Sequence, residues 1–197
     1  MQEILQQTTW QEWLGVSFSI VQVLLARKNN SNNYLFGIAG ILLSLYVMFF
    51  AKLYAEFTLN LYYLVMSIYG WLYWKFGKKQ TETTITETSG SEKLITIGIV
   101  AGTFALFWYF LTHFTDSDVP IFDSLVSAFA WAGMWLMAKR KIENWILLNI
   151  SNMIAVPLLI HKELYLFAGL TAFLFVVAIS GFLEWRKILK SNRADLE

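Results

Sequence analysis

The sequence of 197 residues contains no cysteine, and only 15% of its residues are charged. Without cysteine the chain has no disulfide framework, no thiolate metal ligand and no cysteine nucleophile. Its net charge of +1 gives it no strongly basic character, so a nucleic-acid partner is not expected. No HExxH, GxSxG or Walker-type motif occurs, so the sequence offers no sign of an enzyme and no catalytic residues.

The chain is rich instead in apolar and aromatic residues. Hydrophobic residues make up 57% of it, and nine Trp, nine Tyr and sixteen Phe are among them. The mean hydropathy is +0.51. A soluble domain is about 45–50% apolar and about 25% charged. The composition therefore predicts an integral membrane protein, in contact with membrane lipid over much of its surface.

Long apolar runs predict an all-α membrane fold with seven transmembrane helices. A helix needs about 20 apolar residues to cross a bilayer, with a range of about 17–25. The runs are apolar throughout and do not alternate with period two, which argues against a β-barrel. The predicted spans are residues 13–26, 34–51, 58–74, 94–112, 121–138, 145–160 and 164–184.

Basic residues predict the orientation of these spans. All Lys and Arg residues except Lys52 and Lys162 fall on one side of the predicted topology. Cytoplasmic loops are enriched in Lys and Arg, so we expect that side to be cytoplasmic. The N-terminus is then outside and the C-terminus is cytoplasmic, as an odd number of spans requires.

The sequence repeats itself at an offset of 111 residues. Three helices per copy is an odd number, so one linking helix is needed if both copies are to face the same way. This predicts two parallel three-helix repeats in a 3+1+3 arrangement, a transporter architecture with its substrate near the midplane between the halves. The matching pairs are Lys28 and Lys139, Asn33 and Asn144, Leu53 and Leu164, Tyr54 and Tyr165, Gly70 and Gly181, and Trp74 and Trp185. The predicted segments are a first repeat (1–77), a polar cytoplasmic linker (78–93), a linking transmembrane helix (94–112), a second repeat (113–188) and a cytoplasmic tail (189–197).

Polar and aromatic side chains at helical spacing mark a candidate substrate site. Asn149 and Asn152 lie in an otherwise apolar run, where an unpaired amide costs several kcal/mol, so each needs a partner, a cavity or a ligand. Pro157 frees the carbonyl of Met153 near the same depth. Packing between helices and membership of an interfacial aromatic belt are the alternatives. The candidate substrate-binding residues are Asn60, Tyr63, Ser67, Trp71, Trp131, Trp145, Asn149 and Asn152.

Ionisable residues are missing from the middle of every predicted span. Pumps and proton-coupled carriers usually need such a group, so we expect transport without ion coupling. The last span also has no lysine of the kind that a retinal-binding protein needs. One His and two Asp in the stretch HFTDSD are too weak a signal for a metal site, and no cofactor is predicted.

Several motifs resemble the PnuC family, over the chain from about Trp13 to Trp185. These are YGWLYW (69–74), SNNYLFG (31–37), FDS (122–124) and LMAKRKIENW (136–145). The resemblance implies a bacterial inner-membrane carrier for nicotinamide riboside, with a seven-helix 3+1+3 fold related to the SWEET sugar transporters. It also implies a homotrimer and facilitated diffusion, drawn along by a cytoplasmic kinase that phosphorylates the substrate.

The departures from the family pattern keep a second substrate open. Nicotinamide riboside carriers of this family have Gln at the position of Asn60 and a second Trp at the position of Leu148. Both changes favour thiamine, which the PnuT branch of the family carries. A hypothesis of another class is a heptahelical sensor or scaffold, which would not explain the duplication of the three-helix unit.

Overall fold

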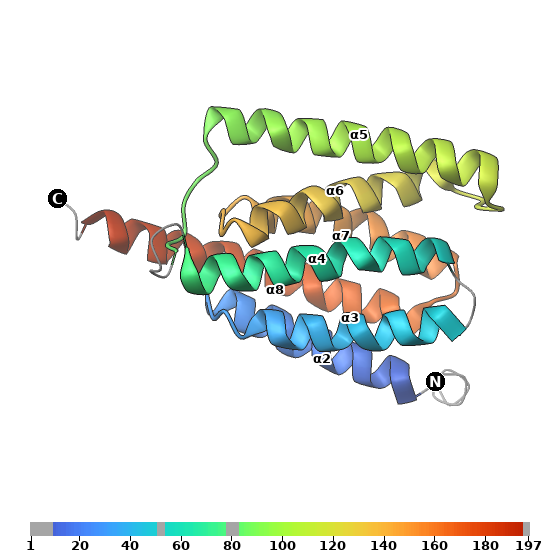
Figure 1. The fold of residues 1–197 in the computed structure, drawn as a ribbon, viewed down its shortest axis with the longest axis horizontal. Coiled ribbons are helices and arrows are strands. Elements are labelled where there is room, and N and C mark those ends of the chain that lie inside the picture. The colour runs from blue at the N-terminus through green and yellow to red at the C-terminus, as the bar shows by residue number, and fades with distance from the viewer. Residues whose placement is uncertain (1–9, 51–53, 78–82, 195–197) are drawn as a thin grey trace. The chain divides into compact units, whose positions relative to one another are not determined.

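The computed structural model describes residues 10–50, 54–77 and 83–194. The described residues form seven helices, and one isolated parallel β-bridge joins Thr86 to Lys141. The helices are α2 (Trp10–Arg27), α3 (Asn33–Phe50), α4 (Tyr54–Phe76), α5 (Gly90–Phe114), α6 (Pro120–Ala138), α7 (Asn144–His161) and α8 (Tyr165–Ala194) (Figure 1). The prediction of an all-α chain with seven helices is confirmed.

Five of the helices are long and apolar enough to cross a membrane. These are α3, α5, α6, α7 and α8. In α2 only Trp13–Arg27 counts as an apolar helix among the described residues, and this stretch is shorter than 18 residues. The helix α4 is rich in Tyr and Trp and is not in that group either. The structure is therefore that of a multi-pass membrane protein, and crossings by α2 and α4 remain predictions.

Several helix boundaries differ from the predicted spans. The helix α2 begins at Trp10 and not at residue 13, and α4 begins at Tyr54 and not at residue 58. The linking helix α5 begins at Gly90 and not at residue 94, because Ser89 and Glu92 form a capping box at its start. The Ser89 N–H donates to Glu92 Oε2 at 2.8 Å, and the Glu92 N–H donates to Ser89 Oγ. The last helix continues to Ala194, so no helix end separates the second repeat from the predicted tail at residue 188. The first part of the predicted linker, residues 78–82, and the last residues, 195–197, lie outside the described residues.

The chain divides into two compact units, residues 1–84 and 85–197. In unit 1, α3 packs against both α2 and α4. In unit 2, α6 packs against α5 and α7, and α7 also packs against α8. Each unit therefore contains a middle helix that contacts the helix before it and the helix after it.

The helix starts and loops of the two units match at the offset of 111 residues. The helices α3 and α7 begin at Asn33 and Asn144, and both of these side chains are fully buried. In each unit the Asn side-chain amide donates to the backbone carbonyl three residues earlier. The loops before these helices each place a non-glycine residue, Asn29 or Arg140, in the left-handed region with φ of 57°.

The aromatic packing of the two units also matches. Tyr34 and Trp74 meet edge to face in unit 1, with ring centroids 5.1 Å apart. At the corresponding positions of unit 2, Trp145 and Trp185 meet edge to face at 5.6 Å. Such pairs add about 0.5–1.5 kcal/mol beyond the area they bury. The repeated Gly-x-x-x-Trp spacing of the sequence thus corresponds to a repeated aromatic contact between consecutive helices.

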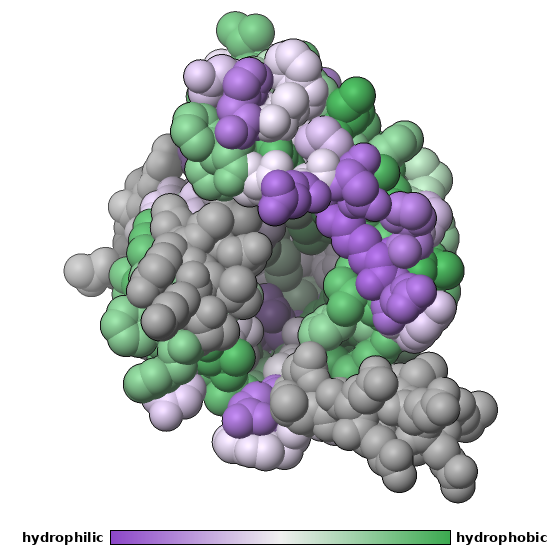
Figure 2. All heavy atoms as spheres, turned by 90° about the vertical axis from the view of Figure 1, so that its right-hand side faces the viewer, coloured by the Kyte–Doolittle hydropathy of each residue, from purple (hydrophilic) through white to green (hydrophobic). Residues whose placement is uncertain are grey.

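An ion pair and a histidine–aspartate hydrogen bond tie together the end of unit 2 that carries the α5–α6 and α7–α8 loops. Lys162 Nζ lies 2.7 Å from both carboxylate oxygens of Asp123. His161 Nε2 lies 2.8 Å from Asp118 Oδ2. Hydrophilic residues gather on this end of the molecule (Figure 2). The start of α6 and the end of α7 are therefore joined by side chains as well as by helix packing.

Candidate functional site

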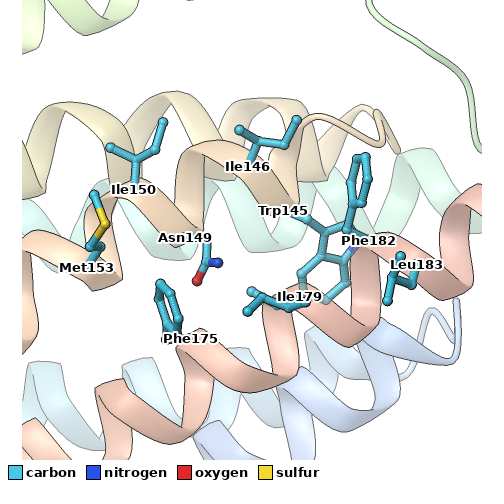
Figure 3. Close-up of a pocket in the computed structure, with 10 residues that line it drawn as sticks. Trp145, Ile146, Asn149, Ile150, Met153, Phe175, Ile179, Phe182 and Leu183 are labelled. Carbon is cyan, nitrogen blue, oxygen red and sulfur yellow. The ribbon is translucent and has the colours of Figure 1, made fainter.

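A groove of about 340 Å³ lies between α7 and α8 in unit 2. Its walls are almost entirely apolar, and no charged side chain lines it. The helix α7 contributes the two lining residues that carry a polar side-chain group, Trp145 and Asn149, one turn apart (Figure 3). The lining residues are Trp145, Ile146, Asn149, Ile150, Met153, Phe175, Ala178, Ile179, Phe182 and Leu183.

Packing from α8 holds Trp145 in place. Its side chain is only 2% exposed, and Trp185 packs edge to face against it. A Cβ atom at position 181 would lie 2.8 Å from the indole, so only glycine leaves room for this ring at the helix contact. Gly70 likewise leaves room for the ring of Tyr34 in unit 1, where a Cβ atom at position 70 would lie 2.5 Å from that ring. Both repeated glycines are therefore explained by close packing of an aromatic ring.

Two polar atoms at the groove have no hydrogen-bond partner among the described residues. They are Nε1 of Trp145, which can only donate, and Oδ1 of Asn149, which can only accept. Leaving a buried polar group unpaired costs about 1–3 kcal/mol. A ligand or a water molecule with both a donor and an acceptor would recover that cost. Pro157 has no backbone N–H, so the Met153 carbonyl also lacks its helical donor.

The chemistry of the groove suits an uncharged or cationic aromatic solute. Phe175, Phe182 and Trp145 provide ring faces and edges, and the Asn149 amide can bind a hydroxyl or a carboxamide. Aromatic faces attract cations by about 0.5–2 kcal/mol per contact. With no Lys or Arg in its lining, the groove offers nothing that would compensate an anionic group such as a phosphate.

The other two candidates in unit 2 lie outside the lining of this groove. Trp131, on α6, packs edge to face against Phe107 of α5 with ring centroids 5.3 Å apart. Asn152 lies on α7 and is half-buried. Trp131 therefore contributes to the contact between α5 and α6.

The four candidates in unit 1 all lie on α4. The side chain of Ser67 is fully buried, and its Oγ has no hydrogen-bond partner among the described residues. Asn60 Nδ2 lies 3.3 Å from Met48 Sδ, a weak acceptor on α3. Ser67 Oγ on α4 and Asn149 Oδ1 on α7 therefore share one property, because each is a buried polar atom without a hydrogen-bond partner among the described residues.

The aromatic candidates of α4 have local partners. Tyr63 packs against Tyr62 with ring centroids 5.8 Å apart. Lys75 Nζ lies 5.2 Å from the centroid of the Trp71 ring, within the range of a cation–π contact. Trp71 is therefore already in contact with one cation from its own helix.

Sequence reasoning missed the wall of the groove that α8 provides. None of these α8 residues is polar, so a search for polar stripes passed over them. The internal repeat was the signal that could have found them, because Ala178 and Phe182 occupy the positions of Ser67 and Trp71. The candidate side chains of unit 1 thus lie on α4, which corresponds to α8 of unit 2, whereas Asn149 lies on α7, which corresponds to α3.

Comparisons with known proteins agree with this fold. The sequence model of the family described as nicotinamide mononucleotide transporter matches residues 9–187. The chain is similar to the nicotinamide riboside transporter PnuC of Escherichia coli (strain K12), with 23% identity over 203 residues that cover 90% of this chain and 85% of that protein. It is also similar to the nicotinamide riboside transporter PnuC of Neisseria mucosa, with 24% identity over 208 residues, or 93% of this chain and 74% of that protein.

A solved structure, the crystal structure of the Vitamin B3 transporter PnuC, shares the fold. It superimposes with a TM-score of 0.72 and 22% sequence identity, covering 92% of this chain and 83% of that one. The family match extends over nearly the whole chain and includes every residue of the groove. The chain therefore belongs to the nicotinamide mononucleotide transporter family, whose members are multi-pass membrane transporters and not enzymes.

Proposed function

We propose that the protein carries nicotinamide riboside across the membrane by facilitated diffusion. The uncharged aromatic groove with the Trp145 donor and the Asn149 acceptor is the observation that carries this proposal. Nicotinamide riboside combines an aromatic cation, a carboxamide and hydroxyl groups, each of which has a counterpart in that groove. The relatives named as nicotinamide riboside transporters support the same substrate.

The substrate-binding residues that we propose include Trp145 and Asn149 of the groove. The other candidates are Asn60, Tyr63, Ser67 and Trp71 in unit 1, and Trp131 and Asn152 in unit 2. Ser67 has the strongest support among these, since it is buried and its hydroxyl has no partner among the described residues. Replacing a contacting residue by Ala weakens substrate binding more than it lowers the yield of folded protein.

The chain consists of two three-helix repeats joined by α5, in a 3+1+3 arrangement. The matching helix starts, left-handed loop residues and edge-to-face aromatic pairs support this assignment. All seven helices cross the membrane, so that both repeats enter it from the same side. Residues 78–93 and the C-terminal tail are then on the side opposite to the loop at Asp116.

The protein is located in a bacterial inner membrane with its N-terminus outside and its C-terminus in the cytoplasm, where it forms a homotrimer. The basic residues support this orientation, since all but Lys52 and Lys162 fall on the cytoplasmic side. A membrane-impermeant thiol reagent added to intact cells should label a cysteine at position 116. Labelling of a cysteine at position 89 would overturn the orientation.

Transport is not coupled to an ion gradient, and a cytoplasmic kinase makes it unidirectional. No ionisable residue lies in the middle of a predicted span, so no proton site can be tied to substrate release. A cationic substrate also responds to the membrane potential, by about 2.3 kcal/mol per 100 mV. Phosphorylation retains the product inside, because an anionic phosphate does not fit a groove without Lys or Arg.

Thiamine is the second candidate substrate, and the packing of Leu148 favours it. A Cβ at Gly133 would lie 2.8 Å from Leu148 Cδ2, so Leu148 fills the contact between α6 and α7. An aromatic ring that could stack on a nicotinamide is therefore missing at position 148. Thiamine is also an aromatic cation with a hydroxyl group, and it does not require that ring.

Two measurements separate these functions from each other and from a sensor or scaffold. Purified protein should gain thermal stability from its own substrate, by about 2.7 kcal/mol at 100 times the dissociation constant. Nicotinamide riboside is expected to give this shift, and thiamine to give little. Expression in a strain without its own vitamin importer should restore uptake, whereas a sensor or scaffold restores none.

A further inference from the structure

A short stretch of the linker, residues 85–89, is held against the loop between α6 and α7. We call it the linker strap. The Thr86 N–H donates to the Arg140 carbonyl at 3.2 Å, and the Ile142 N–H donates to the Thr86 carbonyl at 3.0 Å. The side chain of Ile85 is only 2% exposed, so the strap also contains a buried hydrophobic residue. The strap is therefore an ordered part of unit 2.

Glu143 connects the strap to the first residue of α7. Its Oε1 accepts hydrogen bonds from the Thr88 N–H at 2.9 Å and from the Thr88 hydroxyl at 2.8 Å. Glu143 is also the N-cap residue of α7, where a carboxylate interacts favourably with the helix dipole. One side chain thus joins the strap to the start of the helix that carries Trp145 and Asn149.

Lys141 strengthens the same attachment from the loop. Its Nζ lies 2.8 Å from Glu92 Oε2 in the first turn of α5 and donates to the Glu87 carbonyl at 3.3 Å. Both ends of the strap are therefore held, because Ser89 caps α5 while Thr86 and Thr88 bind the loop and α7. The strap cannot leave the loop without breaking backbone, side-chain and ionic contacts together.

The corresponding loop of unit 1, before α3, has different residues at these positions and a hydrogen bond within the loop itself. Asn32 stands at the position of Glu143, is exposed, and its N–H donates to Asn30 Oδ1 at 2.9 Å within the same loop. Asn30 stands at the position of Lys141. Since the linker occurs once in the chain, the strap is an addition to one repeat, and it acts on the repeat that contains the groove.

We propose that the linker strap sets the position of α7 and that Glu143 is a positioning residue for substrate binding. Trp145 lies two residues after Glu143, and a helix transmits the placement of its first turn to the residues that follow. While the strap is attached to the loop, Trp145 Nε1 and Asn149 Oδ1 keep one relative position, and a ligand must match that position to bind both atoms. This inference rests on the proposed function, because it takes Trp145 and Asn149 to contact the substrate.

Three variants test the proposal. Glu143→Ala removes both bonds to Thr88, Glu143→Gln keeps an oxygen that can accept them, and Asn32→Ala makes a comparable truncation at the repeat-related position. The dissociation constant for nicotinamide riboside and the hydrogen exchange of α7 backbone amides are measured on purified full-length protein. We expect Glu143→Ala to weaken binding about tenfold, because the substrate must then order the first turn of α7 when it binds. Faster exchange should be confined to the strap and the first turns of α7.

The controls and the readouts make each outcome decisive. Glu143→Gln should restore most of the affinity, and Asn32→Ala should leave it unchanged. Unaltered affinity in Glu143→Ala, or an equal loss in Asn32→Ala, would overturn the positioning role while leaving the proposed function intact. If the wild-type protein does not bind nicotinamide riboside, the proposed function fails. The hydrogen exchange of the α7 backbone amides in Glu143→Ala then tests by itself whether the strap holds the start of α7.

Discussion

The two units share a common plan, but they differ in how the ends of their helices are held. In unit 2 the strap holds one end of the α6–α7 pair, and the Asp123–Lys162 ion pair and the Asp118–His161 hydrogen bond hold the other. At the unit 1 positions that correspond to Asp123 and Lys162 the sequence has Glu12 and Ala51, and alanine carries no charge with which to form this ion pair. The repeat therefore retains helix starts and aromatic packing, while the ion pair and the strap are specific to one copy.

The interior of the two units differs in a second, complementary way. In unit 1 a Cβ at Gly37 of α3 would lie 2.8 Å from the Gln22 side chain of α2. At the same pair of positions in unit 2, Leu148 of α7 lies against Gly133 of α6. Each unit has one small and one large residue at this crossing, on opposite helices. Both units thus place a small residue against a large one at this crossing, and the large side chain is a polar amide in unit 1 and apolar in unit 2.

The largest expected effect tests the feature that the two units share. Gly70→Ala and Gly181→Ala each place a methyl group against a buried aromatic ring, so the free energy of unfolding should fall by about 1–3 kcal/mol in both. Chemical or thermal unfolding of the purified protein in detergent measures this.

Gly169→Ala in α8 is the matched control, because nothing lies within 4 Å of a Cβ there. This change should be neutral or should stabilise the protein by up to about 1 kcal/mol. If Gly70→Ala is destabilising and Gly181→Ala is not, the two aromatic contacts are not equivalent and the repeat does not extend to them.

A smaller effect is expected from the ion pair between Asp123 and Lys162 of unit 2. Asp123→Asn weakens this partly buried contact, which should cost about 0.5–1.5 kcal/mol. The matching variant Lys162→Gln and the double variant complete a thermodynamic cycle. A coupling energy near zero would show that this pair does not brace unit 2.

The smallest effect concerns the exposed pair of Asp118 and His161, and it depends on pH. The hydrogen bond from His161 lowers the pKa of the Asp118 carboxyl below its ordinary value of 3.8. A lowered pKa in the folded protein gives stability that is present above the unfolded value and is lost as the pH falls through the folded one. The difference in thermal midpoint between the wild type and Asp118→Asn should therefore shrink as the pH falls below about 4.

Asp116→Asn, which removes a carboxylate from the same loop, is the control for this measurement. A difference that grows on acidification would contradict the sign of the effect.

Much of the fold could be predicted from hydropathy and from the repeat. The observed helices α3, α6 and α7 begin and end within about one residue of the predicted spans, because apolar runs bounded by charged loops leave little freedom for a membrane helix. The offset of 111 residues also located the equivalent helix starts at Asn33 and Asn144. The capped start of α5 and the continuation of α8 past its apolar run were not predicted, because hydropathy alone does not indicate where such helix ends lie.

The candidate site could be predicted only in part. Trp145 and Asn149 were found because an amide or an indole in an apolar helix is unusual, and both line the groove. The packing of Trp131 against Phe107 could not be predicted, because an aromatic stripe does not show which neighbour it faces. The linker strap was also missed, since a polar stretch rich in Thr and Glu is typical of a loop and its pairing depends on a loop about 55 residues away.

Binding of nicotinamide riboside to the purified wild-type protein and to Asn149→Ala tests the central claim most directly. The account predicts saturable binding to the wild type and about tenfold weaker binding to the variant, the size of one hydrogen bond to a buried amide. The variant should unfold at the same temperature as the wild type without ligand, because Asn149 Oδ1 has no partner among the described residues. Equal affinity of the two proteins, or no binding to the wild type, would contradict the assignment of this groove to the substrate.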